Sequence, residues 1–222
     1  MNIDKSPKII KNMFDQISQN YDRMNRIISF GTDKIIKKKC IKLLNIAEKS
    51  IVLDLCTGTG DLVKIIKSFH PEVTITGVDF SKNMLNIAQK SIKNAKFINA
   101  DVTSLPFDKD FFDIITISYG LRNIENRTQA IQEMFRVLKT GGKVLHLDFG
   151  EKTLPGKIFE NITPIIAKFL HQNYKSYKYL AKSKQAFPTP AELIREFEKE
   201  GFQFKQRKDF IMKSISAQVF TK

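Results

Sequence analysis

The feature that most constrains this chain is a stretch of ten residues, Ile51-Val-Leu-Asp-Leu-Cys-Thr-Gly-Thr-Gly60. It begins as a short apolar run, continues as a turn of small residues and leads into a helical pattern. Gly58 and Gly60 let the backbone turn tightly and let a ligand approach it closely. A second apolar run, Val73 to Val78, follows and ends in Asp79. A glycine turn after one strand and an acid at the end of the next predict a nucleotide-type pocket.

The alternation of apolar strands with amphipathic helices continues to about residue 148. Strands are expected at Ile51–Leu55, Val73–Val78, Ala95–Asn99, Phe112–Ser118 and Lys143–Asp148, with helices at Asp61–Phe69, Lys82–Lys93 and Arg127–Leu138. Apolar strands separated by such helices imply a largely parallel sheet that is covered on both faces. Phe202–Asp209 and Ile211–Phe220 are expected to close the sheet as a hairpin. The sequence therefore predicts an α/β fold with a doubly wound, mostly parallel seven-stranded sheet.

The flanking segments suggest how one domain, residues 1–222, is divided. Residues 1–46 are expected to form an N-terminal helical lid, 51–148 the cofactor-binding core, 151–190 a substrate-side insertion, and 191–222 a closing helix and hairpin. The first helix shows apolar residues at three- and four-residue spacing, whereas Tyr21 to Phe30 has no clean period. A helix is expected from about Asp33 to Leu44. Pro164 is expected to kink the apolar stretch in the insertion.

Length and composition limit the class of protein. The chain has 222 residues, of which 42% are hydrophobic, so it can bury one sizeable core. No stretch stays apolar and uncharged for the ~18 residues of a membrane span, and the N-terminus lacks a signal-peptide pattern. Cys40 and Cys56 make neither a disulfide framework nor a metal set, so no metal is expected. A cytoplasmic protein is the default expectation.

The net charge of +14 leaves three interpretations open. Positive charge favours nucleic acid, an anionic membrane surface or an acidic partner. The lysines are spread through the chain, with the densest groups at Lys37–Lys39 and between Lys175 and Lys184. A solvated basic surface is the simplest interpretation, followed by attraction to a membrane surface, and a nucleic-acid groove is not expected.

The glycine stretch favours one class of ligand over others. A dinucleotide site would have a third glycine where this chain has Val63, and no Gly-Lys-Ser/Thr is present to bind a triphosphate. Asp54, at the end of the first strand, would repel a phosphate but would attract a cation. These features favour S-adenosylmethionine, which is positively charged at sulfur and nitrogen and has no phosphate.

Each candidate contact to this cofactor has a physical reason. Asp79 can accept hydrogen bonds from both ribose hydroxyls. The backbone of Gly58, Thr59 and Gly60 can reach the ligand, and Thr59 adds a hydroxyl. The remaining candidates are Asp101 for the adenine amino group, the Val102 backbone for the ring edge, and Ser118 at the end of the fourth strand. Any one of these acids alone could instead cap a helix or lie on the surface.

Several motifs resemble class I S-adenosylmethionine-dependent methyltransferases, and one branch in particular, the ubiquinone/menaquinone-biosynthesis C-methyltransferases. The resemblance spans about residues 14 to 202, and its most specific parts are Tyr21-Asp-Arg-Met-Asn25 and Gly120-Leu-Arg-Asn123. Further matching stretches are Leu53 to Asp61, Asp79-Phe-Ser-Lys-Asn-Met-Leu85, Ala100 to Phe107, Glu133 to Gly142 and Tyr177 to Ser183. The chain departs from the family at Cys56, at Ile36 and in the C-terminal tail.

The resemblance implies methylation of a ring carbon on a prenylated quinol. Arg122 and Asn123 are expected to stabilise the developing phenolate or to orient a water, and Tyr21 to act from the lid; the Arg-Asn pair could also simply fix its loop. Apolar residues of the insertion, such as Phe159, Ile162 and Phe169, offer a route for the prenyl tail or serve as core packing. Peripheral contact with an anionic membrane and a homodimer are both left open.

Two other functions remain as alternatives. An RNA or DNA methyltransferase would fit the basic charge, but an amino-methylase block of the Asn/Asp-Pro-Pro-aromatic type is missing where this chain has Ser118-Tyr-Gly-Leu-Arg. The other alternative is a non-catalytic S-adenosylmethionine-binding protein with the same fold. The complete set of cofactor candidates argues against it.

Overall fold

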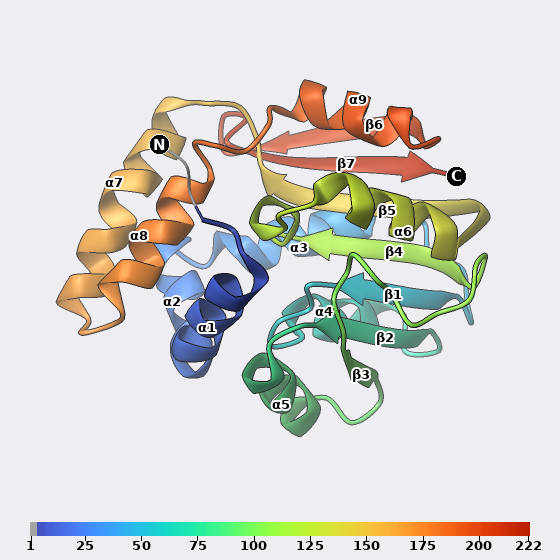
Figure 1. The fold of residues 1–222 in the computed structure, drawn as a ribbon, viewed down its shortest axis with the longest axis horizontal. Helices are drawn as coiled ribbons and strands as arrows, with labels where there is room; N and C mark the ends of the chain where they lie inside the picture. Colours follow the sequence, from blue (N-terminus) through green and yellow to red (C-terminus); the bar gives the residue numbers. More distant parts are fainter. Residues whose placement is uncertain (1–3) are drawn as a thin grey trace.

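The structure, a computed structural model, describes residues 4–222, which form a seven-stranded sheet in the order β3-β2-β1-β4-β5-β7-β6 (Figure 1). Strands β1 to β5 run parallel, and β7 runs antiparallel to both β5 and β6. The bounds are β1 Ile51–Leu55, β2 Thr74–Asp79, β3 Lys96–Asn99, β4 Phe112–Ser118, β5 Leu138–Phe149, β6 Gln203–Phe210 and β7 Ile215–Thr221. The predicted fold class and the closing hairpin are confirmed.

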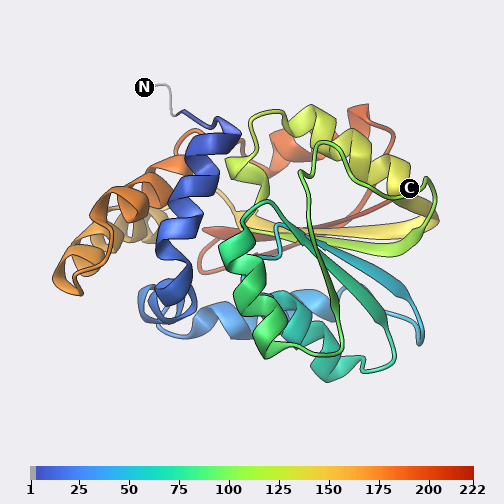
Figure 2. The same cartoon turned by 60° about the horizontal axis from the view of Figure 1, so that its bottom comes forward.

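Helices cover both faces of this sheet (Figure 2). Successive residues of β1 enter different cores: Val52 packs in one cluster and Leu53 in the other. Since side chains alternate between the faces of a strand, burial on both faces explains why β1 reads as a continuous apolar run. On one face lie α3 (Thr32–Ile41), α4 (Asp61–Phe69) and α5 (Lys82–Ser91), and on the other α6 (Arg127–Val137) and α9 (Pro190–Lys199).

Four further helices gather at the carboxyl ends of the parallel strands (Figure 1). They are α1 (Pro7–Ile17), α2 (Tyr21–Ile28), α7 (Leu154–Phe169) and α8 (Tyr174–Ser183), with the short 3-10 turn η1 (Ser18–Asn20) between the first two. Met24 of α2, Ala167 of α7 and Tyr177 of α8 share a third apolar cluster. The N-terminal helices and the insertion therefore pack together, although about 130 residues separate them in the sequence.

Local differences from the predicted elements have physical reasons. α2 is amphipathic, because Tyr21, Met24 and Ile28 stand at helical spacing and pack in the third apolar cluster, so the expectation that this stretch has no clean period was wrong. α8 was not predicted, although the buried Tyr177, Leu180 and Ala181 stand at helical spacing, and Asn173 caps it by accepting from the Ser176 amide.

One predicted boundary differs in the second half of the chain. The helix expected at Arg127–Leu138 ends at Val137, and β5, expected from Lys143, begins directly at Leu138. α7 continues through Pro164 as one helix. Leu138 pairs with Phe112, and the register between β4 and β5 shifts before Lys143.

Candidate active site

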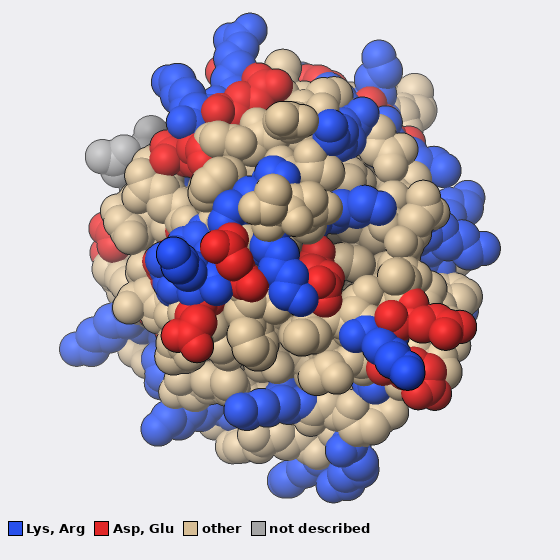
Figure 3. Space-filling view, turned by 90° about the vertical axis from the view of Figure 1, so that its right-hand side faces the viewer, with Lys and Arg blue, Asp and Glu red and all other residues tan. Residues whose placement is uncertain are grey.

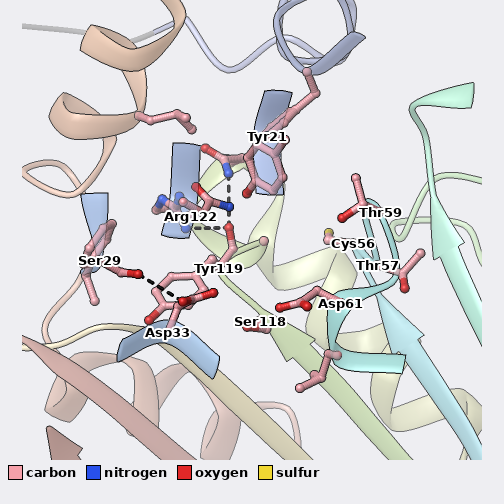
Figure 4. Close-up of a pocket in the computed structure, with 18 of the residues that line it drawn as sticks. Tyr21, Ser29, Asp33, Cys56, Thr57, Thr59, Asp61, Ser118, Tyr119 and Arg122 are labelled. Carbon is pink, nitrogen blue, oxygen red and sulfur yellow. Dashed lines mark hydrogen bonds between the residues drawn. The ribbon is translucent and has the colours of Figure 1, made fainter. Parts of the chain in front are cut away.

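A cavity of about 780 Å³ lies where β1, β2 and β4 end. Its walls come from the glycine stretch, from the ends of β2 and β4, and from α1, α2 and α7. Figure 4 shows two groups that face one another across it: Arg122 and Tyr119 follow β4, while Thr57 and Thr59 belong to the loop after β1. In an open parallel sheet this crevice is the usual ligand site.

The loop between β1 and α4 has the conformation that its glycines allow. Gly58 and Gly60 have φ values of 55° and 78°, in the left-handed region that favours glycine. A Cβ at Gly58 would meet no atom within 4 Å, so its backbone lies open to the cavity. A Cβ at Gly60 would come within 2.5 Å of Ile92, so this glycine is needed for packing. The two glycines therefore have different roles: Gly58 exposes backbone to the cavity and Gly60 admits a neighbouring side chain.

Asp79 lies at the end of β2 with both oxygens oriented by backbone amides. Its Oδ2 accepts from the Gly58 amide at 2.9 Å, and its Oδ1 accepts from the Ser81 amide at 2.9 Å. Burial raises the pKa of Asp79 to about 6, although these hydrogen bonds favour the charged form. A carboxylate has about four acceptor sites, so both oxygens can still accept from a ligand diol.

Asp54 is more buried than the sequence suggested. Its Oδ2 accepts from the Thr57 hydroxyl and its Oδ1 from the Thr116 hydroxyl, both at 2.6 Å. Burial raises the pKa of Asp54 to about 6 against these two hydrogen bonds. The residue contributes to the cavity wall, and each of its oxygens, like those of Asp79, has one protein hydrogen bond and further acceptor capacity. Asp54 can therefore act on a cationic ligand through its charge or by accepting a hydrogen bond.

The other sequence candidates also line the cavity. Asp101 is exposed and accepts at Oδ1 from the backbone and the hydroxyl of Thr103, both at 2.8 Å. Val102 is buried beside it. The Ser118 hydroxyl is buried and has no hydrogen-bond partner within residues 4–222. An unpartnered buried hydroxyl at the end of β4 is a group that a ligand could satisfy.

The N-terminal helices are tied to the loops of the cavity by two acids. The Thr59 hydroxyl donates to Asp22 Oδ1 at 2.6 Å, and the Ser81 hydroxyl donates to Asp15 Oδ1 at 2.5 Å. Neither Asp15 nor Asp22 was predicted from the sequence to contact these loops. Their signal was weak, because no local pattern indicates which distant hydroxyl an acid on a helix will meet.

Arg122 lies in the turn η2 (Leu121–Asn123), and its side chain is almost fully buried. Its Nη1 donates to Asp148 Oδ1 at 3.1 Å and to the Tyr119 carbonyl, while Nε donates to Ser183 Oγ at 3.2 Å. Asn123 donates to the same carbonyl at 3.4 Å, and its Oδ1 has no partner among the described residues. The structure thus brings Arg122 and Asn123 together on the cavity wall. No sequence pattern indicated Asp148 as a partner of Arg122.

Tyr21 stands at the start of α2 and also lines the cavity. Its ring meets Phe14 of α1 edge-on, with 6.1 Å between the ring centroids. Figure 4 shows it on the α2 side of the pocket, with Arg122 and Tyr119 next to it. The three residues expected to act on the substrate therefore lie on one cavity.

Comparison with known proteins places this geometry in a family. The profile of the ubiE/COQ5 methyltransferase family matches residues 1–220. The chain belongs to the ubiE/COQ5 methyltransferase family. A demethylmenaquinone methyltransferase of Listeria monocytogenes is 36% identical over 212 residues, which are 90% of this chain and 89% of that protein. One of Staphylococcus aureus is 37% identical over 203 residues, 87% of this chain and 84% of that protein.

Solved structures support the fold of this family member. A SAM-dependent methyltransferase from Thermotoga maritima superposes with a TM-score of 0.73 at 17% identity, covering 96% of this chain and 99% of that one. Another from Aquifex aeolicus gives a TM-score of 0.66 at 14% identity, covering 90% and 98%. At these identities the likeness concerns the fold alone.

The methyl donor of this family member is S-adenosylmethionine. The cavity suits it, because the open backbone of Gly58 and the carboxylate of Asp79 lie together, while the Ser118 hydroxyl has no hydrogen-bond partner among the described residues. Gly58, Thr59 and Asp79 stay our candidates for holding its ribose and amino-acid parts, whereas Gly60, also predicted as a contact, is not among the residues that line the cavity. Asp101 and Val102 are candidates for the adenine, and Ser118 is a candidate contact at the end of β4.

Proposed function

We propose that this chain methylates a ring carbon of a prenylated quinol in menaquinone or ubiquinone biosynthesis. Demethylmenaquinol is the first candidate, since relatives from Listeria and Staphylococcus are named demethylmenaquinone methyltransferase, and a polyprenyl-methoxybenzoquinol is the second. The main support is that one cavity has two chemically different parts. Gly58 and Asp79 line one part, whereas Phe159, Ile162 and Leu180 line another.

The chemistry requires a reduced ring. When bound, S-adenosylmethionine supplies a methyl group on a positively charged sulfur, which is a good leaving group. A quinol carbon next to a hydroxyl is rich in electrons, whereas a quinone carbon attracts them. The ring carbon becomes more nucleophilic as the neighbouring hydroxyl loses its proton, and the methylated carbon must then lose its own proton to a base. The site therefore has to stabilise a phenolate and hold the ring in line with the methyl group.

Arg122 is our candidate for stabilising the phenolate. Arginine stays protonated in proteins, so it can donate hydrogen bonds to an oxyanion but cannot accept the proton. Asn123 stands beside it, and its Oδ1, which has no partner within residues 4–222, can orient a water; such a water is our candidate base. Tyr21 would contact the substrate from the lid.

The insertion offers a route for the prenyl tail and a contact with a membrane. Exposed apolar side chains stand three or four residues apart along α7: Leu154, Ile158, Ile162, Ile165 and Phe169. Ile158 and Ile162 also line the cavity, so this stripe leads into the site. No helix within residues 4–222 is long and apolar enough to cross a membrane. Because the exposed Lys157 and Lys168 flank the stripe, we propose a peripheral contact with an anionic surface.

Vesicle flotation tests the membrane contact. The wild-type chain should float with vesicles that contain phosphatidylglycerol, and Phe169→Glu should float less. Phe111→Glu is the matched control, because Phe111 is exposed on the loop before β4, outside α7 and the cavity lining. Wild-type protein that stays in solution, with or without substrate, would refute this contact.

A direct assay tests the proposed activity. The purified chain is incubated with S-adenosylmethionine and a short-chain demethylmenaquinol kept reduced by dithionite, and products are separated by mass. We expect the product to gain one methyl group, and the oxidised quinone to remain unchanged. The absence of product from both candidate quinols would refute the proposal. Accumulation of demethylmenaquinone in a gene-deleted strain would identify the substrate.

Binding measurements separate the alternatives. A non-catalytic protein would bind S-adenosylmethionine in a calorimeter but would methylate neither quinol. An RNA methyltransferase would transfer the labelled methyl group of S-adenosylmethionine to RNA and would methylate neither quinol. On the face shown in Figure 3, which is turned away from the helices around the cavity, lysines and arginines are interspersed with acidic and uncharged side chains.

A homodimer remains a prediction. The edge strand β6 exposes Lys205 and Lys208, and lysines at an edge disfavour pairing with another strand. We therefore expect any dimer to use a surface other than this edge. Sedimentation velocity measures the oligomeric state directly.

A further inference from the structure

The most deeply buried ion pair near the cavity joins Arg122 to Asp148. The Nη1 atom of Arg122 lies 3.1 Å from Asp148 Oδ1, and the two side chains are 5% and 0% exposed. Asp148 comes from the end of β5, whereas Arg122 follows β4. Neighbouring parallel strands therefore bring the pair together beside the reaction site.

Three further contacts orient the Arg122 guanidinium. Ser183 of α8 accepts from Nε, the Tyr119 carbonyl accepts from Nη1, and the Phe149 ring lies 5.0 Å from the guanidinium carbon. These contacts come from the β4 loop, the end of β5 and the insertion. Nη2 takes part in none of these hydrogen bonds, which leaves it as the donor for a ligand oxygen.

Asp148 does not contact the cavity itself. Its Oδ1 also accepts from the Phe149 amide at 2.8 Å, and its Oδ2 is buried without a partner in the described part of the chain. A buried ion pair is weak evidence for stability, because removing two charges from water costs about as much as their attraction returns. A role in orienting Arg122 explains why such a pair lies here.

We propose that Asp148 is a positioning residue for the methyl transfer. It holds the Arg122 guanidinium in one orientation and balances its charge. The inference rests on the proposed quinol methylation. It implies that the field which a bound ring hydroxyl experiences comes from the Arg122–Asp148 pair and not from an isolated cation.

Because Asp148 balances the charge of Arg122, its replacement should shift the pH dependence of kcat. In Asp148→Asn the positive charge of Arg122 is no longer offset, so the phenolate form of the bound substrate is favoured. The pKa of its hydroxyl then falls, and the acidic limb of the kcat profile moves to lower pH. The plateau of kcat falls as well, because Arg122 loses an orienting contact. A merely structural residue would not move that limb.

The test compares Asp148→Asn, Asp148→Glu and Ser183→Ala with the wild type on short-chain demethylmenaquinol. We expect Asp148→Asn to lower kcat by roughly 100-fold, since misplacing a reacting group by about 1 Å can cost that much. Its Kd for S-adenosylmethionine should stay within about twofold of the wild type. Asp148→Glu keeps the charge, so it should retain the wild-type pH limb and recover part of kcat.

Ser183→Ala keeps the proposal testable if Asp148→Asn does not fold. It removes one neutral acceptor from Nε, and a loss of several-fold in kcat is expected with no shift of the pH limb. Wild-type kcat in a folded Asp148→Asn, or a lowered kcat with an unmoved pH limb, would overturn the inference. If Asp148→Asn does not fold, wild-type kcat in both Asp148→Glu and Ser183→Ala would overturn it. A wild-type chain that methylates no quinol would instead refute the proposed function.

Discussion

The hydroxyl of Thr59 donates a 2.6 Å hydrogen bond to Asp22 Oδ1 and so joins the glycine loop to helix α2. A second hydrogen bond, from Ser81 to Asp15, joins the loop after β2 to helix α1. The loop after β1 and the loop after β2 are therefore each tied to one N-terminal helix, α2 and α1 respectively. This arrangement implies that lid closure and cofactor binding favour each other, because both depend on the same two loops.

Asp22→Ala tests this relationship. The substitution removes a charge-assisted hydrogen bond, which contributes about 1.5 kcal/mol, so the Kd for S-adenosylmethionine should rise by about tenfold. Proteolysis of the linker between α2 and α3 should become faster. Asp108→Asn, on an exposed loop outside the cavity lining, is the matched control and should change neither quantity. Unchanged affinity in Asp22→Ala would show that the lid does not respond to the cofactor.

Asp79→Asn should weaken cofactor binding more than any other single change in the pocket. The carboxylate accepts from two backbone amides and can still accept from a diol, and hydrogen bonds to charged groups contribute about 1.5–3 kcal/mol each. We expect the Kd to rise by about 100-fold or more in calorimetry.

Asp101→Asn is the comparison for Asp79→Asn. Asp101 is exposed, and Thr103 already occupies its Oδ1, so we expect only a few-fold loss. Equal effects of the two substitutions would contradict the assignment of Asp79 to the ribose.

As the pH rises, Asp54 and Asp79 should lower the stability of the folded chain and raise its affinity for the cofactor. Burial raises the pKa of both Asp54 and Asp79 to about 6, from an ordinary value of 3.8. Between pH 4 and 6 the folded chain thus holds more protons than the unfolded chain, so these groups lower its stability as the pH rises. Binding, by contrast, needs the carboxylates charged.

Two measurements on the wild type check these signs. Asp54 and Asp79 should make the ligand-free chain melt at a higher temperature at pH 5.5 than at pH 7.5. The affinity for S-adenosylmethionine should be higher at pH 7.5. Asp79→Asn removes one of the two groups and should reduce both trends. Affinity that does not change with pH would contradict a binding role for these carboxylates.

The strands and the glycine loop could be predicted because their signals are local. The apolar run of β1, the small residues after it and the acid that ends β2 all follow from short stretches of sequence. The environment of Asp54 could not be predicted in this way. Its partner Thr116 stands opposite it in the register of β1 and β4, and a register between strands 62 residues apart leaves no local pattern.

The same limit explains what was missed around Arg122. Gly120-Leu-Arg-Asn123 indicated a functional turn through its resemblance to a family, but the resemblance did not indicate what holds the arginine. Asp148 and Ser183 are 26 and 61 residues away from it and meet it only through the packing of β5 and α8. The sequence identified Arg122 as a candidate functional residue, whereas the orientation of its side chain depends on the tertiary structure.

Gly120→Ala should disturb the turn that presents Arg122. A Cβ at Gly120 would lie 2.4 Å from the Cβ of Cys56 and 2.7 Å from its sulfur, so the glycine loop and the β4 loop would have to separate. Overpacking of this kind costs about 1–3 kcal/mol, and we expect a lower melting temperature together with weaker cofactor binding.

Cys56→Gly should rescue the Gly120→Ala variant. It removes the side chain that the new methyl group meets, and it relieves a non-glycine residue at a φ of 52°. We therefore expect the double variant to melt at a higher temperature than Gly120→Ala alone, with a favourable coupling energy in the double-mutant cycle. Additive effects of the two substitutions would show that Cys56 and Gly120 do not set the spacing of the two loops.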